Sequence, residues 1–148
     1  ITTTGSVIFS HERIGRGGKT FKCYKFRSMH ADAEERLKSI LEENPDIKKE
    51  WEATQKLKND PRITSVGKIL RKTSLDELPQ FWNVLIGDLS VVGPRPVVYK
   101  ELVTHFGTKA TKILSIRPGI TGIWQVSGRS DTSYKTRILL DETYVDTQ

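Results

Sequence analysis

The sequence contains very little sulfur and no long hydrophobic run. Cys23 is the single cysteine among 148 residues, so the chain cannot form an internal disulfide bond or build a metal site from several cysteines. One thiol fits a reducing compartment. No apolar run approaches the roughly 20 residues that a membrane-spanning helix needs, and the sequence has no internal repeat. These absences exclude a disulfide-rich secreted domain, a cysteine-built zinc domain and, within these residues, a membrane-spanning helix.

The composition is that of a soluble globular domain with a strong positive charge. Hydrophobic residues make up 36% and charged residues 28% of the chain, the net charge is +6 and the pI is near 9.5. The length predicts one domain over residues 1–148. The charge predicts an anionic partner, which could be nucleic acid, a phosphorylated metabolite or an acidic lipid headgroup.

The two ends indicate a piece of a longer protein. The chain begins at Ile1 without a methionine, and residues 134–148 have the pattern of a helix with no stop signal. We therefore expect further segments on both sides.

The stretch over residues 71–88 organises the chain. Ser74 and Glu77 have the spacing of a capping box, which predicts that a helix begins at Ser74. Pro79 would crowd the carbonyl of Leu75 in such a helix, so either the helix begins slightly later or its first turn is irregular. Its buried face is expected to consist of Leu78, Trp82, Leu85 and Ile86.

Asp76 and Glu77 are candidate functional acids within this stretch. In the first helical turn, free N–H groups and the helix dipole would favour their negative charge. Acids at this place most often serve only as caps. Capping and chemistry therefore both remain open from these residues alone.

Arginines in rigid loops form the second feature. Arg95 lies between two prolines that restrict its backbone, which suits an arginine that binds phosphate in one geometry. Arg117 and Arg129 lie in further loops shaped by glycine or proline. A glycine turn over residues 15–18, between strands expected near residues 7–9 and 21–26, carries basic residues that either hold phosphate or are merely solvated.

The remaining pattern predicts an α/β fold that is mostly helical, with a small sheet or hairpin. Helices are expected over residues 32–57, with a restart at Pro45, and over residues 66–72, 97–106 and 109–116. Residues 89–92 are expected to form a buried strand and residues 123–126 a short strand. Residues 60–62 and 117–122 are expected to form a turn and a loop.

A series of ordered motifs resembles the bacterial sugar transferase family, the monotopic phosphoglycosyl transferases that start the assembly of exopolysaccharides and other glycans. The resemblance covers nearly the whole chain and makes a purely capping role for Asp76 a minority interpretation. The motifs are VIF with HERIG over residues 7–15, YKFRSM over 24–29, DPRIT over 60–64, RKTSLDELPQ over 71–80, GPRP over 93–96 and RPGITGIWQVSGR over 117–129.

The resemblance implies transfer of a phospho-sugar, usually from a UDP-sugar, to polyprenyl phosphate with release of UMP. Asp76 matches the family's nucleophile and Glu77 its partner, with Mg²⁺ required and both acids as its expected ligands. Arg71 and Arg95 match positions linked with phosphate binding. The loops that carry Arg117, Gln125 and Arg129 match a region associated with the nucleotide.

The resemblance also places the protein at the cytoplasmic face of the bacterial inner membrane. The family carries a membrane-inserting helix before the first strand, together with amphipathic segments at the membrane surface. The first is missing from this sequence, and the chain ends inside the last of these segments. The membrane-anchoring ends are therefore expected to be absent, the fragment itself to be soluble, and homo-oligomer formation stays open.

The physical chemistry of a phosphorus-attacking carboxylate is consistent with these roles. The carboxylate must be ionised, and a helix N-terminus together with Arg71 would lower the pKa of Asp76. Neighbouring helical residues point about 100° apart, so Asp76 and Glu77 should divide the work instead of sharing a proton. Asp76 would attack, while Glu77 would assist metal binding or the second half-reaction.

Two other function classes remain open. A nucleic-acid-binding domain would explain the charge, although the basic residues are spread over loops and form no single stripe. A regulatory module that binds nucleotide without turnover is the other. Retention on duplex DNA would favour the first alternative, and a failure to consume a UDP-sugar would favour the second.

Overall fold

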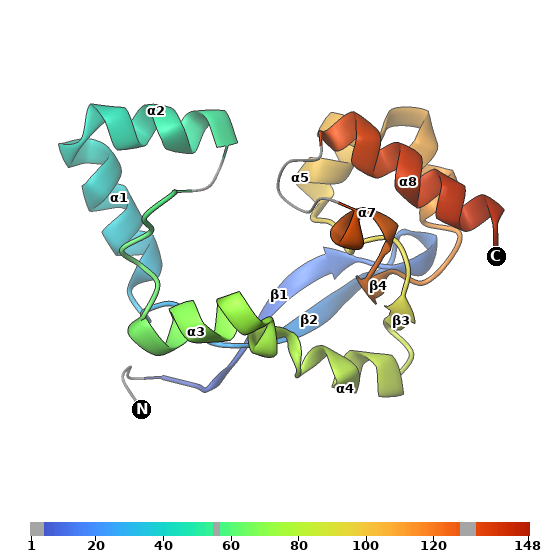
Figure 1. The fold of residues 1–148 in the computed structure, drawn as a ribbon, viewed down its shortest axis with the longest axis horizontal. Coiled ribbons are helices and arrows are strands. Elements are labelled where there is room, and N and C mark those ends of the chain that lie inside the picture. The colour runs from blue at the N-terminus through green and yellow to red at the C-terminus, as the bar shows by residue number, and fades with distance from the viewer. Residues whose placement is uncertain (1–4, 55–56, 128–132) are drawn as a thin grey trace. The chain divides into compact units, whose positions relative to one another are not determined.

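The computed structural model describes residues 5–54, 57–127 and 133–148 (Figure 1). These residues form two compact units, one built from residues up to 9 and 26–76, the other from residues 10–25 and 77–148. The predicted α/β class is confirmed: the described elements are mostly helical, with two small two-stranded sheets.

A hairpin of β1 (Ile8–Ile14) and β2 (Thr20–Phe26) opens the chain, as predicted. The glycine turn between these strands contains the short 3-10 helix η1 (Arg16–Gly18). It is closed by a hydrogen bond from the Gly15 N–H to the Lys19 carbonyl at 2.7 Å. Gly17 and Gly18 both have positive φ, which explains why this turn needs glycine.

The described residues of the first unit form three α-helices: α1 (Ala33–Glu43), α2 (Pro45–Thr54) and α3 (Ser65–Thr73). Pro45 starts α2, as the sequence predicts. Gly67 on α3 lies directly against the backbone of Ser28, because a Cβ there would come within 1.9 Å of the Ser28 carbonyl oxygen. The N-terminus of α3 is capped by Thr64, whose side chain accepts a 2.8 Å hydrogen bond from the Gly67 N–H.

The predicted turn at residues 60–62 forms and contains a buried ion pair. The Arg62 guanidinium donates two hydrogen bonds to the Asp60 carboxylate, at 2.8 and 2.6 Å. Burial opposes the ionisation of Asp60, but these hydrogen bonds hold its pKa below the ordinary value. The guanidinium also lies 4.9 Å from the centre of the Trp51 ring. Trp51 of α2 and the turn are thereby joined within the first unit.

The second unit is built around a parallel pair of short strands, β3 (Ser90–Val92) and β4 (Gly119–Thr121). Ser90 is paired with Gly119 and Val92 with Thr121. Residues 119–121 were expected in a loop and residues 123–126 in a strand, and both predictions were wrong. The strand is β4, and the next residues form the helical turn α7 (Ile123–Val126). Gly119 allows this arrangement, since a Cβ there would lie 2.1 Å from the Gly93 nitrogen.

Helical segments pack beside this sheet. The predicted helix over residues 97–106 is one α-turn that continues into a π-helical turn and ends at Gly107, with φ of +50°. Val97, Phe106, Ile113 and Ile138 form the hydrophobic core of the unit. The segments are α4 (Gln80–Leu85), α5 (Tyr99–Glu101), η3 (Leu102–Phe106), η4 (Gly107–Lys109), α6 (Ala110–Ile113) and α8 (Tyr134–Asp146).

The buried-face prediction for α4 was wrong. Trp82 and Leu85 are 58% and 78% exposed, and Leu78 and Ile86 are about half exposed. The buried residues of α4 are polar, and Asn83 is completely buried. Its amide donates to the Lys22 carbonyl at 2.8 Å and accepts from the Tyr24 N–H at 3.1 Å. Hydrogen bonds to β2 therefore fix this helix, and its apolar face points outward.

The expected buried strand over residues 89–92 forms only in part. Leu89 is 1% exposed and lies just before β3, whereas Val91 and Val92 within the strand are 47% and 43% exposed.

Candidate active site

The backbone around the two candidate acids is irregular. No helix begins at Ser74, so the capping-box prediction was wrong. Ser74 instead ends α3 with φ of +58°, and its N–H bonds back to the Arg71 carbonyl at 3.3 Å. It is the only non-glycine residue of the described chain with positive φ, a conformation that costs about 1–2 kcal/mol. Backbone strain of this kind is concentrated at functional sites.

Asp76 and Glu77 lie in the 3-10 turn η2 (Leu75–Glu77), before α4 begins at Gln80. Pro79 explains the break, because a proline inside a helix has no N–H to donate and its ring clashes with the carbonyl four residues earlier. The irregular first turn considered from the sequence is therefore present. The helix-dipole argument for the acids does not hold, since they precede α4 by more than one position.

The two acids differ in their surroundings. Asp76 is 9% exposed and is the last residue of the first unit. Glu77 is the first residue of the longer segment of the second unit. Glu77 is partly exposed and accepts a 2.6 Å hydrogen bond from the Lys25 ammonium on β2. This ion pair fixes the orientation of the Glu77 carboxylate.

A cationic cluster surrounds Cys23 in the second unit. The thiol is 4% exposed, and burial raises its pKa. Four charged groups lie near enough to act on it: Lys25, Arg13, Glu77 and Arg95. The structure thus places Glu77 and Arg95 within electrostatic range of Cys23, together with the cations Lys25 and Arg13.

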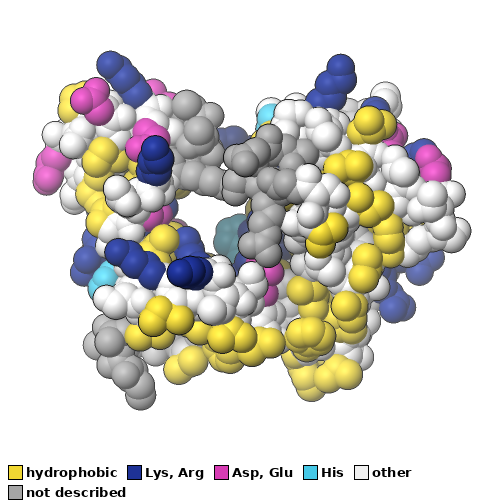
Figure 2. All heavy atoms as spheres, in the orientation of Figure 1, with side chains coloured by type: hydrophobic (Ala, Val, Ile, Leu, Met, Phe, Trp, Pro, Cys, Tyr) yellow, Lys and Arg dark blue, Asp and Glu magenta, His cyan; other side chains and the backbone are white. Residues whose placement is uncertain are grey.

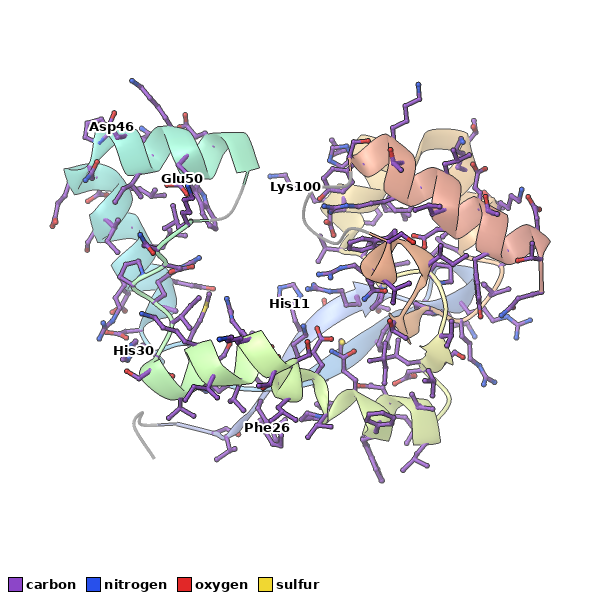
Figure 3. The ribbon with its side chains drawn as sticks, in the orientation of Figure 1. His11, Phe26, His30, Asp46, Glu50 and Lys100 are labelled. Atoms are coloured by element: carbon purple, nitrogen blue, oxygen red, sulfur yellow. The ribbon has the colours of Figure 1, made fainter. Side chains whose placement is uncertain are left out.

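Arg13, which is partly buried, and Arg95, which is exposed, are like charges that lie near one another. Burial lowers the pKa of Arg13, and the neighbouring Arg95 lowers it further. The Arg13 guanidinium is hydrogen-bonded to the imidazole of His11, which Figure 3 labels on β1. The Ile14 N–H donates to the Val97 carbonyl at 2.9 Å and so holds β1 beside the arginine turn. Two guanidinium groups held together in this way favour a bound anion.

The turn that carries Arg95 is held by its backbone. Pro94 is fully buried, and its carbonyl accepts from the Gly119 N–H at 2.8 Å. The Gly93 N–H donates to the Thr121 carbonyl at 2.9 Å. Arg95 itself is exposed, with its guanidinium carbon 5.7 Å from the centre of the Trp124 ring. A free side chain on a fixed backbone agrees with the rigid platform expected from the two prolines.

Arg117 and Gln125 approach the same turn. The Arg117 carbonyl lies next to Gly93, where an added Cβ would be 2.8 Å away. The Gln125 side chain donates to the Ile120 carbonyl at 3.0 Å. Its Oε1 is buried and has no hydrogen-bond partner among the described residues. The β3–β4 pair therefore gathers Arg95, Arg117 and Gln125, whereas Arg129 lies outside the described residues.

Arg71 lies in the first unit. Its guanidinium donates a 2.9 Å hydrogen bond to the Ser28 hydroxyl. Arg71 follows Gly67 by four residues, so it lies on the face of α3 that meets Ser28. Ser28 and its hydroxyl were not identified from the sequence, although the residue is part of the YKFRSM motif.

Other residues of the site were missed for lack of a local signal. The Arg137 guanidinium carbon lies 4.6 Å from the centre of the Trp124 ring, which Arg95 also contacts. Asp141 on α8 is 3% exposed, and burial raises its pKa to about 7. Lys25 could have been found, since it follows Cys23 by two residues and therefore lies on the same face of the predicted strand. Arg13 had been noted only as a loop cation.

The donor set fits a divalent cation held jointly by protein and substrate. No group of three or more His, Cys, Asp or Glu side chains that could hold a metal ion occurs within residues 5–54, 57–127 and 133–148. Mg²⁺ is typically bound through one or two carboxylates together with phosphate oxygens and water. Two acids adjacent in the sequence match that pattern, so Asp76 and Glu77 remain its expected ligands.

Comparison with known proteins places these residues in a family. Over 141 residues the chain is 55% identical to "Undecaprenyl-phosphate galactose phosphotransferase" of Salmonella typhimurium, which covers 95% of this chain and 29% of that protein. It is 54% identical to "Exopolysaccharide production protein ExoY" of Rhizobium meliloti, covering 95% and 62%.

The similarity extends to more distant relatives. The chain is 38% identical over 156 residues to "UDP-glucose:undecaprenyl-phosphate glucose-1-phosphate transferase" of Escherichia coli, covering 98% of the chain and 30% of the relative. It spans less than two thirds of each of these three proteins. The family model "Bacterial sugar transferase" matches residues 1–148. The chain therefore belongs to the bacterial sugar transferase family.

Proposed function

We propose that the protein transfers a sugar phosphate from a UDP-sugar to polyprenyl phosphate and releases UMP. The observation that carries this proposal is the 55% identity, over 95% of the chain, with a relative named for galactose phosphate transfer to undecaprenyl phosphate. Relatives named for galactose are 48–55% identical, whereas those named for glucose are 38–42% identical. UDP-galactose is therefore the first donor to test.

The chemistry proceeds in two displacements at one phosphorus atom. A carboxylate oxygen of Asp76 attacks the β-phosphorus of the donor, the bond from that phosphorus to the bridging oxygen breaks, and UMP leaves with that oxygen. A phosphate oxygen of the lipid acceptor then attacks the same phosphorus, and the bond to Asp76 breaks. Glu77, oriented by Lys25, assists metal binding and the second displacement.

The cations of the site would bind the diphosphate and offset its negative charge. A carboxylate that approaches a diphosphate meets like charge, so cations must offset the repulsion. Arg13 and Arg95 lie close enough for each to act on the other's charge, beside Lys25. We assign phosphate binding to Arg95 with Arg13, and also to Arg71. Arg117, Gln125 and Arg129 are assigned to the nucleotide.

Mg²⁺ is proposed as the cofactor, with Asp76 and Glu77 as its protein ligands. When bound, the cation would neutralise charge on the diphosphate and on the departing UMP. The pairing of Glu77 with Lys25 involves one carboxylate oxygen. The other carboxylate oxygen is then the one we assign to the metal.

We place the site at the membrane surface, on the cytoplasmic side of the bacterial inner membrane. No helix in the described part of the chain is long and apolar enough to cross a bilayer. However, hydrophobic side chains gather on the surface around α4 (Figure 2). Their exposed fractions run from 47% to 78%, and Glu77 directly precedes them in the chain. These residues are Leu78, Phe81, Trp82, Leu85 and Ile86.

The decisive test uses mass spectrometry of the intact protein. The protein is mixed with Mg²⁺ and UDP-galactose without acceptor, and then with polyprenyl phosphate in liposomes while UMP is assayed. We expect a hexose phosphate adduct on Asp76 that the acceptor removes. Asp76→Asn should give no adduct, while Asp146→Asn, an exposed carboxylate paired with Lys112, should behave as wild type. An active Asp76→Asn protein would refute the mechanism.

A further inference from the structure

Helix α8 holds the arginine turn at two points. The Tyr144 hydroxyl donates a 3.1 Å hydrogen bond to the Val92 carbonyl. One helical turn earlier, the Asp141 carboxylate is 3% exposed and lies near enough to Arg95 to interact with its main chain and its charge. The two contacts lie on either side of the Gly93-Pro94 corner. The helix therefore bonds to the entry of the turn and places a buried carboxylate near its exit.

The helix that makes these contacts is itself well anchored in the second unit. Ser133 caps its N-terminus, accepting from the Thr136 N–H at 3.2 Å. Ile138 places its apolar face in the core. Lys109 and Lys112 form ion pairs with Glu142 and Asp146 of α8. A carboxylate on such a support has little freedom to move away from Arg95.

Asp141 is an energetically unfavourable residue at this position, because its carboxylate is buried. It is 3% exposed, and no salt-bridge partner for its side chain occurs among the described residues. Burying a carboxylate without an ion pair is unfavourable. A neutral residue would serve packing better, so a role tied to Arg95 explains the acid. Its negative charge also faces the positive charge of Arg95.

We propose that Asp141 is a positioning residue that holds Arg95 in the geometry needed to bind the substrate phosphate. It acts through the Arg95 main chain and touches no substrate. This inference rests on the proposed function for its catalytic consequence, but the contact itself can be tested without turnover.

Protonation of Asp141 should weaken this hold, since a carboxylate accepts a hydrogen bond more strongly than a carboxylic acid. Of the charged groups around it, Arg95 acts on it directly. The other titratable or charged groups on α8 are Tyr134, Lys135, Arg137, Glu142, Tyr144 and Asp146. Those on the elements packed against it are His105, which stacks on Tyr134, Glu101, which accepts from the Tyr134 hydroxyl, and Lys109 and Lys112.

The first experiment follows the Arg95 amide by NMR during a pH titration, with no substrate present. We expect its resonance to titrate with a midpoint near the pKa of about 7 of Asp141 in the wild type. The titration should be absent in Asp141→Asn and retained in Asp146→Asn. An Arg95 amide that titrates equally in Asp141→Asn would overturn the proposal.

The second experiment is a double-mutant cycle on kcat/KM at pH 8. Asp141→Ala should lower kcat/KM about tenfold to a hundredfold, as loss of one hydrogen bond to a charged group allows, and Asp141→Asn should lie between wild type and alanine. In an Arg95→Ala background, Asp141→Ala should cost almost nothing further, because its effect passes through Arg95. Additive losses would overturn the positioning role. A wild type that is inactive would instead refute the proposed function, and the amide titration would still decide the contact.

Discussion

Asp141 should make the stability of the protein fall as pH rises through neutrality. The pKa of Asp141 is about 7 in the folded chain, against an ordinary value of 3.8, because burial disfavours its charged form. Between these values the native state holds a proton that the unfolded chain has released. Stability from this group is complete below pH 3.8 and is lost as pH rises through 7.

The magnitude follows from the two pKa values. Their difference, 7 − 3.8, is about 3, and each unit corresponds to about 1.4 kcal/mol, so the full effect is about 4 kcal/mol. Between pH 5 and pH 8 the loss amounts to about 3 kcal/mol. Asp141→Asn removes the titrating group and keeps a hydrogen-bond acceptor of the same shape. The free energy of unfolding of the variant, relative to wild type, should rise by that amount over the same range.

Urea unfolding at several pH values, followed by tryptophan fluorescence, measures this difference. Two of the three tryptophans, Trp82 and Trp124, belong to the unit that contains Asp141, and Trp51 belongs to the first unit, so two of the three fluorophores report on the unit of Asp141. Asp146→Asn makes the same chemical change at an exposed position of α8 and should show no comparable slope. If the Asp141→Asn variant and the wild type differ by the same amount at pH 5 and pH 8, the carboxylate is ionised throughout and the burial argument is wrong.

Three further predictions concern the site and its support. Arg95→Lys keeps the charge but loses the planar fork, so kcat/KM should fall about tenfold or more; full activity would mean that Arg95 supplies only general charge. Gly67→Ala should destabilise the protein by about 3 kcal/mol, measured by urea unfolding, because the new Cβ would meet the Ser28 carbonyl at 1.9 Å; a neutral change would refute the packing of α3. Chelation of divalent metal by EDTA should abolish UMP release, with recovery on adding Mg²⁺; turnover that survives EDTA would remove the metal from the mechanism.

Local patterns predicted much of the fold because they act over a few residues. The strands of the hairpin, the restart of a helix at Pro45 and the end of a helical segment at Gly107 were all confirmed. Each depends on a proline, a glycine or an alternation that sets its own backbone. The same kind of local pattern gave a wrong prediction for the stretch from residue 71 to residue 88. There the capping-box spacing competed with Pro79, and the proline decided where α4 begins.

The outward face of α4 could not be predicted from its periodicity. Apolar spacing shows that a helix has an apolar face, but not what that face meets. Here Asn83 satisfies backbone groups of β2, and an amide that makes such bonds is costly to expose or replace. The polar side of α4 is therefore buried, and its apolar side is left exposed at the surface.

The site shows the same limit at a larger scale. Arg95 could be identified from the sequence because the two adjacent prolines restrict its backbone. Asp141 lies far from Arg95 in the sequence, and nothing near it marks it as more than a helical acid. Only the packing of α8 buries this carboxylate and brings it near Arg95. The prolines restrict the arginine turn, but a restricted turn still needs a second element to fix its place. In this chain that element is α8, so the position of the Arg95 turn depends on Asp141 and Tyr144, which lie 46 and 49 positions after Arg95 in the sequence.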